Sequence, residues 1–174
     1  MTELEVVGYI IIAMLVILVF IGFAWEDIRR KSLHSQAPEF AQRHGFIYSP
    51  AGGDSKYDWK FDSQDGPETH YYASFEHFPF NTGLKRVVSF VIEGVYQQAT
   101  FRAFEYTFHT RLGRYMQRHR YSIVMIRTPR RIPQIPGEVF WENGSLVQYV
   151  KGHFDPDTIL DRVEYLVELA NHKA

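Results

Sequence analysis

The pattern of hydrophobic positions begins with one long apolar run near the N-terminus. No charged residue lies between Glu5 and Glu26, which leaves the uninterrupted segment Val6 to Trp25. A helix of that length rises about 30 Å, the thickness of the hydrocarbon core of a bilayer. The pattern therefore predicts a transmembrane helix at about residues 6–25.

The charges on either side of this run predict its orientation. Glu3 and Glu5 precede it, whereas Arg29, Arg30 and Lys31 follow it directly. Basic flanks remain on the cytoplasmic side of a membrane. We therefore expect a single-pass protein of the cell membrane, with the N-terminus outside and the rest of the chain in the cytoplasm.

The sequence of the apolar segment does not identify what the helix packs against. Its small residues lack the GxxxG spacing, so the sequence carries no strong homodimer signal. Residues 22–24 have the small-x-small form of a signal-peptidase site, but the acidic N-terminus and the long apolar run disfavour cleavage. The helix is either a plain lipid-facing anchor or packs on helices of another membrane complex. The candidate contact residues are Ile11, Leu15, Leu18 and Trp25.

The change in pattern after the basic cluster divides the chain. We assign residues 1–31 to the membrane anchor, 32–37 to a polar linker and 38–174 to a soluble domain. Pro38 suits the first turn of a helix and Gly45 suits its end. The sequence thus predicts a short helix there, followed by a strand at 46–48.

Alternation of apolar and polar residues predicts strands further along the chain. It is clearest at residues 88–92 and 103–108, which are joined near Gln97-Gln98, with Gly94 as a candidate bulge. Residues 120–127 are apolar on both faces, which is typical of a central strand. Residues 50–86 predict no clear element, apart from a helical turn at Tyr57 to Phe61.

The C-terminal third predicts a hairpin and a helix. Residues 138–141 and 146–150 flank Asn143-Gly144, a strong hairpin signal. Asp155 caps the following helix and Pro156 takes its first position. Five or six antiparallel strands with helices over one face make an α+β domain. The apolar face of the last helix comprises Ile159, Leu160, Val163, Leu166, Val167 and Ala170.

Charge is balanced overall but not locally. The 174 residues carry 19 Lys and Arg against 20 Asp and Glu, yet residues 85–131 hold ten bases and two acids. Pairing with the acidic flanks of the domain is the default explanation. Alternatively, a loop from His109 to His119 binds anionic headgroups or an acidic protein surface, and the anchor argues against nucleic acid. The basic residues of that loop are Arg111, Arg114 and Arg118.

The sequence offers little for catalysis. It contains no cysteine, no Walker A motif, no GxGxxG and no HExxH. Glu76-His77 is more consistent with an ordinary histidine than with a metal site, and the acidic loop at 62–68 with turn chemistry than with calcium binding. A PxxP pattern at 130–136 fits an extended connector. We therefore expect no catalytic, cofactor-binding or metal-binding residues.

A resemblance emerges from the strand segments taken together. Behind a single N-terminal span lie Val87-Val88, Gly94-Val95-Tyr96, Phe101 to Tyr106 and Arg120 to Val124. This arrangement resembles a family of uncharacterised single-pass membrane proteins of actinobacteria, over about residues 38–170. The family implies no known activity. The Gln97-Gln98 turn departs from the basic residue and glycine that such proteins often carry.

The expected function is that of a non-enzymatic accessory or assembly subunit. Size, a single span and the lack of cofactor ligands are similar to the accessory subunit of the actinobacterial cytochrome bcc–aa3 respiratory supercomplex. The expected partners are the membrane and other membrane-protein subunits. The alternative is a membrane-anchored domain that holds a lipid or small ligand between the sheet and the last helix, in a cavity lined by residues such as Phe104 and Tyr106.

Overall fold

The computed structural model describes most of the chain, which divides into the compact units Met1–Ser35 and Gln36–Ala174. The described backbone covers residues 3–50, 75–129, 131 and 137–171, without the side chains of residues 3–10, 22–24, 26, 27, 29–31 and 34. The predicted turn at Tyr57 to Phe61, the acidic loop at 62–68 and the PxxP segment except Arg131 lie outside the described residues.

The first unit consists of a long helix. Helix α1 (Glu3–His44) begins in this unit and ends in the second. Judged on the described residues alone, no helix combines the length and the apolarity that crossing a membrane requires.

The end of α1 was predicted correctly, but the division into two separate helices was not. A separate helix beginning at Pro38 is wrong, because α1 continues through this residue. The fixed φ of proline is helical, so proline prefers a first turn without requiring one. The predicted stop is confirmed: Gly45 has a φ of +69°, and the backbone N–H of Phe46 donates to the carbonyl of Ala41 at 2.8 Å.

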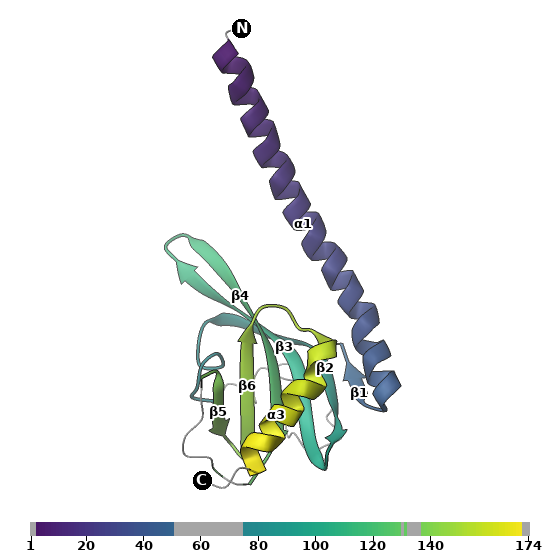
Figure 1. Cartoon of the computed structure of the whole chain (residues 1–174). Helices are drawn as coiled ribbons and strands as arrows, with labels where there is room; N and C mark the ends of the chain where they lie inside the picture. The colour runs from purple at the N-terminus through teal and green to yellow at the C-terminus, as the bar shows by residue number, and fades with distance from the viewer. Residues whose placement is uncertain (1–2, 51–74, 130, 132–136, 172–174) are drawn as a thin grey trace. The chain divides into compact units, whose positions relative to one another are not determined.

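The second unit is built on an antiparallel sheet of six strands in the order β1-β2-β3-β4-β6-β5 (Figure 1). This confirms the α+β class, with an antiparallel sheet and a C-terminal packing helix. The strands are β1 (Ile47–Ser49), β2 (Leu84–Tyr96), β3 (Ala99–Leu112), β4 (Tyr115–Arg127), β5 (Val139–Glu142) and β6 (Ser145–Lys151).

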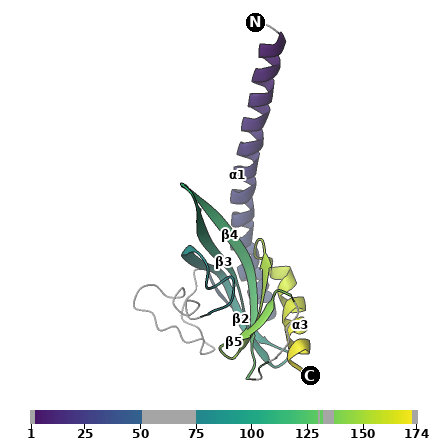
Figure 2. The same cartoon turned by 90° about the vertical axis from the view of Figure 1, so that its left-hand side faces the viewer.

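One face of the sheet is covered by the C-terminal helix (Figure 2). The side chain of Asp155 accepts a hydrogen bond from the N–H of Asp157 and caps the short turn η1 (Pro156–Thr158), which leads directly into α3 (Ile159–Asn171). The predicted start of this helix is thus confirmed. Its fully buried residues against the sheet are Ile159, Val163 and Leu166.

The opposite face carries a cluster of buried aromatic side chains, which we call the aromatic core. Residues 75–83, which lead into β2, contribute Phe75 and Phe80 to it. The Phe80 ring lies 4.9 Å from the Tyr106 ring in an edge-on arrangement. The cluster comprises Phe75, Phe80, Val88, Val91, Phe104, Tyr106, Phe108, Tyr121, Ile123, Met125, Phe140 and Val147.

The register of the sheet corrects the predicted bulge at Gly94. This residue pairs regularly with Phe101, and the irregularities of β2 lie before Val87 and before Ile92. A Cβ atom on Gly94 would lie within 2.3 Å of the Phe46 ring. The glycine therefore makes room for that ring, which packs edge-on against Phe101 at 4.9 Å.

Both predicted hairpin turns are confirmed. Gln97 and Gln98 have φ of +48° and +65°, and Asn143 and Gly144 have +50° and +71°. Positive φ at both central residues is the signature of the type I′ turn, whose twist matches the strands it joins.

The predicted loop from His109 to His119 is wrong. β3 and β4 continue through it as paired strands, with only Gly113 and Arg114 in the turn. The sequence shows no apolar alternation here, because the side chains at 111–118 are exposed on both faces. The backbone pairing of the two strands continues through this part of the hairpin.

Candidate functional site

One arginine adds polar contacts to the apolar packing of helix α3 on the sheet. The guanidinium of Arg162 donates from Nε to Gln148 Oε1 at 2.8 Å and from Nη1 to Ser122 Oγ at 2.7 Å. Its Nη2 donates to the carbonyls of Ser122 and Gln148, at 3.1 and 3.2 Å. Burial lowers the pKa of Arg162 to about 10, against the opposing effect of the Glu138 charge. The group therefore stays charged at neutral pH and connects α3 to β4 and β6.

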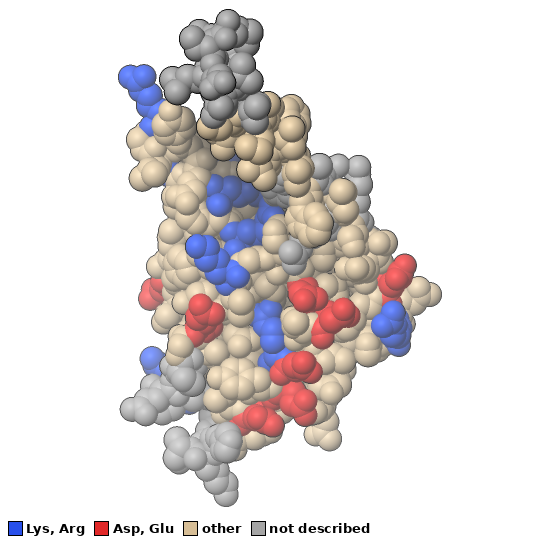
Figure 3. All heavy atoms as spheres, turned by 45° about the horizontal axis from the view of Figure 1, so that its top comes forward, with Lys and Arg blue, Asp and Glu red and all other residues tan. Residues whose placement is uncertain are grey.

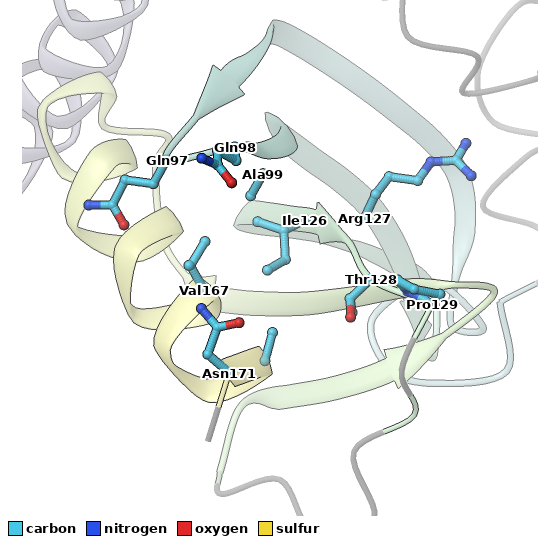
Figure 4. A pocket seen from close by; sticks show the side chains of 10 residues that line it. Gln97, Gln98, Ala99, Ile126, Arg127, Thr128, Pro129, Val167 and Asn171 are labelled. Carbon is cyan, nitrogen blue, oxygen red and sulfur yellow. The ribbon is translucent and has the colours of Figure 1, made fainter. Parts of the chain in front are cut away.

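An open cleft of about 510 Å³ lies where the far end of α3 meets the end of the sheet (Figure 4). Val167 projects from α3 toward Ile126 of β4, and Arg127 extends away from the cleft. The side-chain amide of Gln97 donates to Glu164 Oε1 at 3.1 Å and so joins the β2–β3 turn to α3. The lining residues are Gln97, Gln98, Ala99, Ile126, Arg127, Thr128, Pro129, Val167, Ala170 and Asn171.

The lining of this cleft offers both apolar contacts and hydrogen-bonding groups. Its volume falls within the range of small-molecule sites, and its lining combines apolar residues with amide and hydroxyl groups that can form hydrogen bonds. Of the described residues that line it, Arg127 alone is ionisable. The alternative hypothesis of a ligand-binding domain requires an apolar cavity between the sheet and the last helix, lined by residues such as Phe104 and Tyr106. Phe104 and Tyr106 are fully buried in the aromatic core instead.

Within the aromatic core, burial raises the pKa of Tyr106 to about 12, against a lowering effect of the Arg86 charge. Tyr48 and Tyr121 also have a raised pKa, for which burial is again the main cause. A tyrosine that ionises near pH 10 in the unfolded chain keeps its proton up to a higher pH in the folded domain. Folding is then favoured below pH 10, and this contribution is lost as the pH rises from 10 toward 12.

We therefore expect the phenol of Tyr106 to ionise about two pH units later than an exposed tyrosine. In an absorbance titration at 295 nm, Tyr106→Phe should remove a late step near pH 12 and leave the early steps unchanged. Loss of a step near pH 10 instead would show that this side chain is open to solvent.

The basic segment 85–131 contains two described ion pairs. The buried guanidinium of Arg102 lies 3.1 Å from Glu93, and Arg120 lies 3.4 Å from Glu105. Glu105 also accepts a hydrogen bond from the backbone N–H of Phe154. In both pairs the acid belongs to the segment itself, on the neighbouring strand, and not to the acidic flanks.

Glu76 and His77 contact side chains of strand β5. Nδ1 of His77 lies 3.0 Å from Glu142 Oε2, and the same carboxylate accepts hydrogen bonds from the backbone N–H groups of Glu76 and His77. The imidazole stacks on Phe140 at 4.8 Å. In the part of the chain that the structure describes, no group of three or more His, Asp or Glu side chains is arranged to hold a metal ion.

The predicted contact residues fall into two sets. Ile11, Leu15, Leu18 and Trp25 are exposed on α1, whereas the side chains of Arg29, Arg30 and Lys31 lie outside the described residues. Arg111, Arg114 and Arg118 come together at the end of the β3–β4 hairpin. Sequence reasoning missed their exposed apolar neighbours, although these adjoin the Gly-Arg turn in the sequence: Leu112, Tyr115 and Met116.

Comparisons of the chain with protein-family models, with curated proteins and with solved structures each gave no significant match. The functional argument therefore depends on the residues and the geometry described above.

Proposed function

We propose that this chain is a single-pass membrane protein that acts, without catalysing a reaction, as an accessory or assembly subunit of a larger membrane complex. In this proposal the segment 6–25 crosses the membrane, the N-terminus lies outside and the 38–174 domain lies in the cytoplasm. The domain then serves as a binding module for the other subunits.

The main observation behind this proposal is the apolar surface of α1. The large hydrophobic side chains from Ile11 to Ile21 are each about half exposed or more, from 48% at Val16 to 70% at Phe20. Consecutive helical residues point about 100° apart, so this surface surrounds the helix. A helix that is apolar on every side is buried in protein or in a bilayer.

The rest of the anchor argument depends on the sequence. The apolar run includes residues whose side chains are not described, and it has the length of a bilayer core. The basic residues at 29–31 favour the proposed orientation. The complex that we propose to test first is the actinobacterial cytochrome bcc–aa3 supercomplex, because a mass of 20.4 kDa and one span resemble its accessory subunit.

A double substitution in the middle of the run tests the anchor. Arginine at a helix centre costs about 2.5 to 3.5 kcal/mol on an insertion scale, so Leu15→Arg with Leu18→Arg should abolish stable insertion. We expect the wild-type chain to stay in the membrane pellet after carbonate extraction and the variant to move to the supernatant. The matched control, Leu15→Val with Leu18→Val, should stay in the pellet. Extraction of the wild-type chain by carbonate would contradict the anchor.

The cleft at the end of α3 supports a second candidate function, the binding of a lipid or small ligand by the anchored domain. Ile126 and Val167 offer apolar contact, while Gln98 and Asn171 offer hydrogen bonds. Native mass spectrometry of the purified chain tests this function. A retained small molecule that is lost from Val167→Trp would support it, whereas a chain of bare mass would count against it.

A further inference from the structure

The β3–β4 hairpin extends beyond the rest of the sheet (Figure 1). β2 pairs with β3 up to Leu84 opposite His109, and β6 pairs with β4 from Lys151 opposite Tyr121. Residues 110–120, which we call the arm, therefore have no strand neighbour outside the hairpin among the described strands.

The end of the arm is apolar. Leu112, Tyr115 and Met116 are 68%, 80% and 44% exposed. Leu112 and Tyr115 are direct cross-strand partners and share one face of the arm, while Met116 pairs with Arg111 on the other face. These side chains belong to no described core of the domain, so apolar contact surface is available on both faces of the tip.

Positive charge lies beside this apolar tip. The side chains of Arg111, Arg114 and Arg118 are exposed, and the sequence has no Asp or Glu between Glu105 and Glu138. In the space-filling view, several Lys and Arg gather in the upper part of the face shown, while the Asp and Glu lie lower and are mixed with further Lys and Arg (Figure 3). The tip thus combines an apolar end with three nearby arginines, Arg111, Arg114 and Arg118, which we call the collar.

We propose that the arm tip inserts into the interface of an anionic lipid bilayer. Tyrosine is favoured at the headgroup level, where its ring is apolar and its hydroxyl is hydrated. Arginine pairs with phosphate through two parallel hydrogen bonds and keeps its charge in water while its stem lies along apolar groups. Anionic headgroups complement the collar.

The arrangement of the tip favours a bilayer over an acidic protein as the occupant. Apolar side chains project from both faces of a two-stranded ribbon, with Leu112 and Tyr115 on one face and Met116 on the other. Lipid surrounds an inserted tip on all sides, whereas the surface of a partner covers one face. The inference builds on the proposed membrane location and assigns a second point of contact to it.

The absence of cysteine in the sequence allows labelling at one site. We would attach an environment-sensitive fluorophore to the full-length Leu112→Cys chain, reconstituted in zwitterionic vesicles or in vesicles with added phosphatidylglycerol. The label should shift to the blue and be quenched by nitroxide-labelled lipids when phosphatidylglycerol is present. The control label at Asp161→Cys, an exposed position on α3, should remain unquenched.

Neutralising the collar tests its charge. Arg111→Gln and Arg114→Gln should each lower the insertion equilibrium about five-fold, and added salt should do the same, while the thermal midpoint stays unchanged. A label that remains in water while the chain floats with anionic vesicles would overturn the arm proposal and leave the anchor intact. If the chain floats with neither type of vesicle, both the arm proposal and the anchor are overturned. If the fluorophore becomes shielded from water only when another protein co-purifies, the tip is assigned to a protein partner instead.

Discussion

Phe80→Ala should destabilise the domain by about 3 to 5 kcal/mol, the range for removing a fully buried aromatic side chain. Phe80 is 0% exposed, and its ring lies within 5.1 Å of the Phe75 ring as well as near Tyr106. Its loss leaves a cavity at the point where residues 75–83 cover the sheet. Urea denaturation of the full chain in mild detergent measures the free energy of unfolding.

Phe78→Ala is the matched control from the same segment. Phe78 is 38% exposed, although its ring lies 5.2 Å from Tyr121 and 5.4 Å from Tyr149. We expect a loss of about 1 kcal/mol. Equal losses for the two variants would show that the aromatic core does not stabilise the sheet as described.

The second large effect is expected at Arg162. Arg162→Ala removes four hydrogen bonds from a charged group and leaves the Ser122 and Gln148 side chains without their partner. Relief of the buried charge offsets part of this loss. We expect a net loss of about 2 to 4 kcal/mol in the same denaturation experiment.

We also expect the Arg162→Ala variant to loosen α3 locally, because Arg162 connects this helix to β4 and β6. Relative to wild type, the rate of amide hydrogen exchange should increase more in α3 than in β3. Arg162→Lys should restore only part of the protection, since a lysine ammonium lacks the planar set of N–H donors of a guanidinium. Glu168→Ala, at an exposed position on the same helix, should change stability by less than about 0.5 kcal/mol. Unchanged exchange in α3 would mean that apolar packing alone holds the helix.

Elements with local signals could be predicted from the sequence. Asn143-Gly144 has the residue types that a type I′ turn requires, and Asp155-Pro156 those of a helix start. The apolar periodicity of α3 predicted the face that is buried. In each case the residues that determine the structure lie within a few positions of one another.

Features that depend on distant contacts could not be predicted. Arg162 lies 40 positions from Ser122, and nothing in the local pattern distinguishes it from an exposed charge. The arm lacks the alternation of apolar and polar residues because neither of its faces packs on a core, so the sequence predicted a loop where the structure has strands. Gly94 looked like a bulge because the Phe46 ring that occupies the space beside it lies 48 positions earlier in the sequence.

Affinity purification through a tag after Ala174, from native membranes in mild detergent, tests the central proposal most directly. We expect stoichiometric membrane-protein subunits, with haem absorption if the partner is the respiratory supercomplex, and their loss from the Leu15→Arg, Leu18→Arg variant. A chain that elutes alone and colourless, with wild type and variant alike, would contradict the accessory-subunit proposal and leave the cleft as the site to examine.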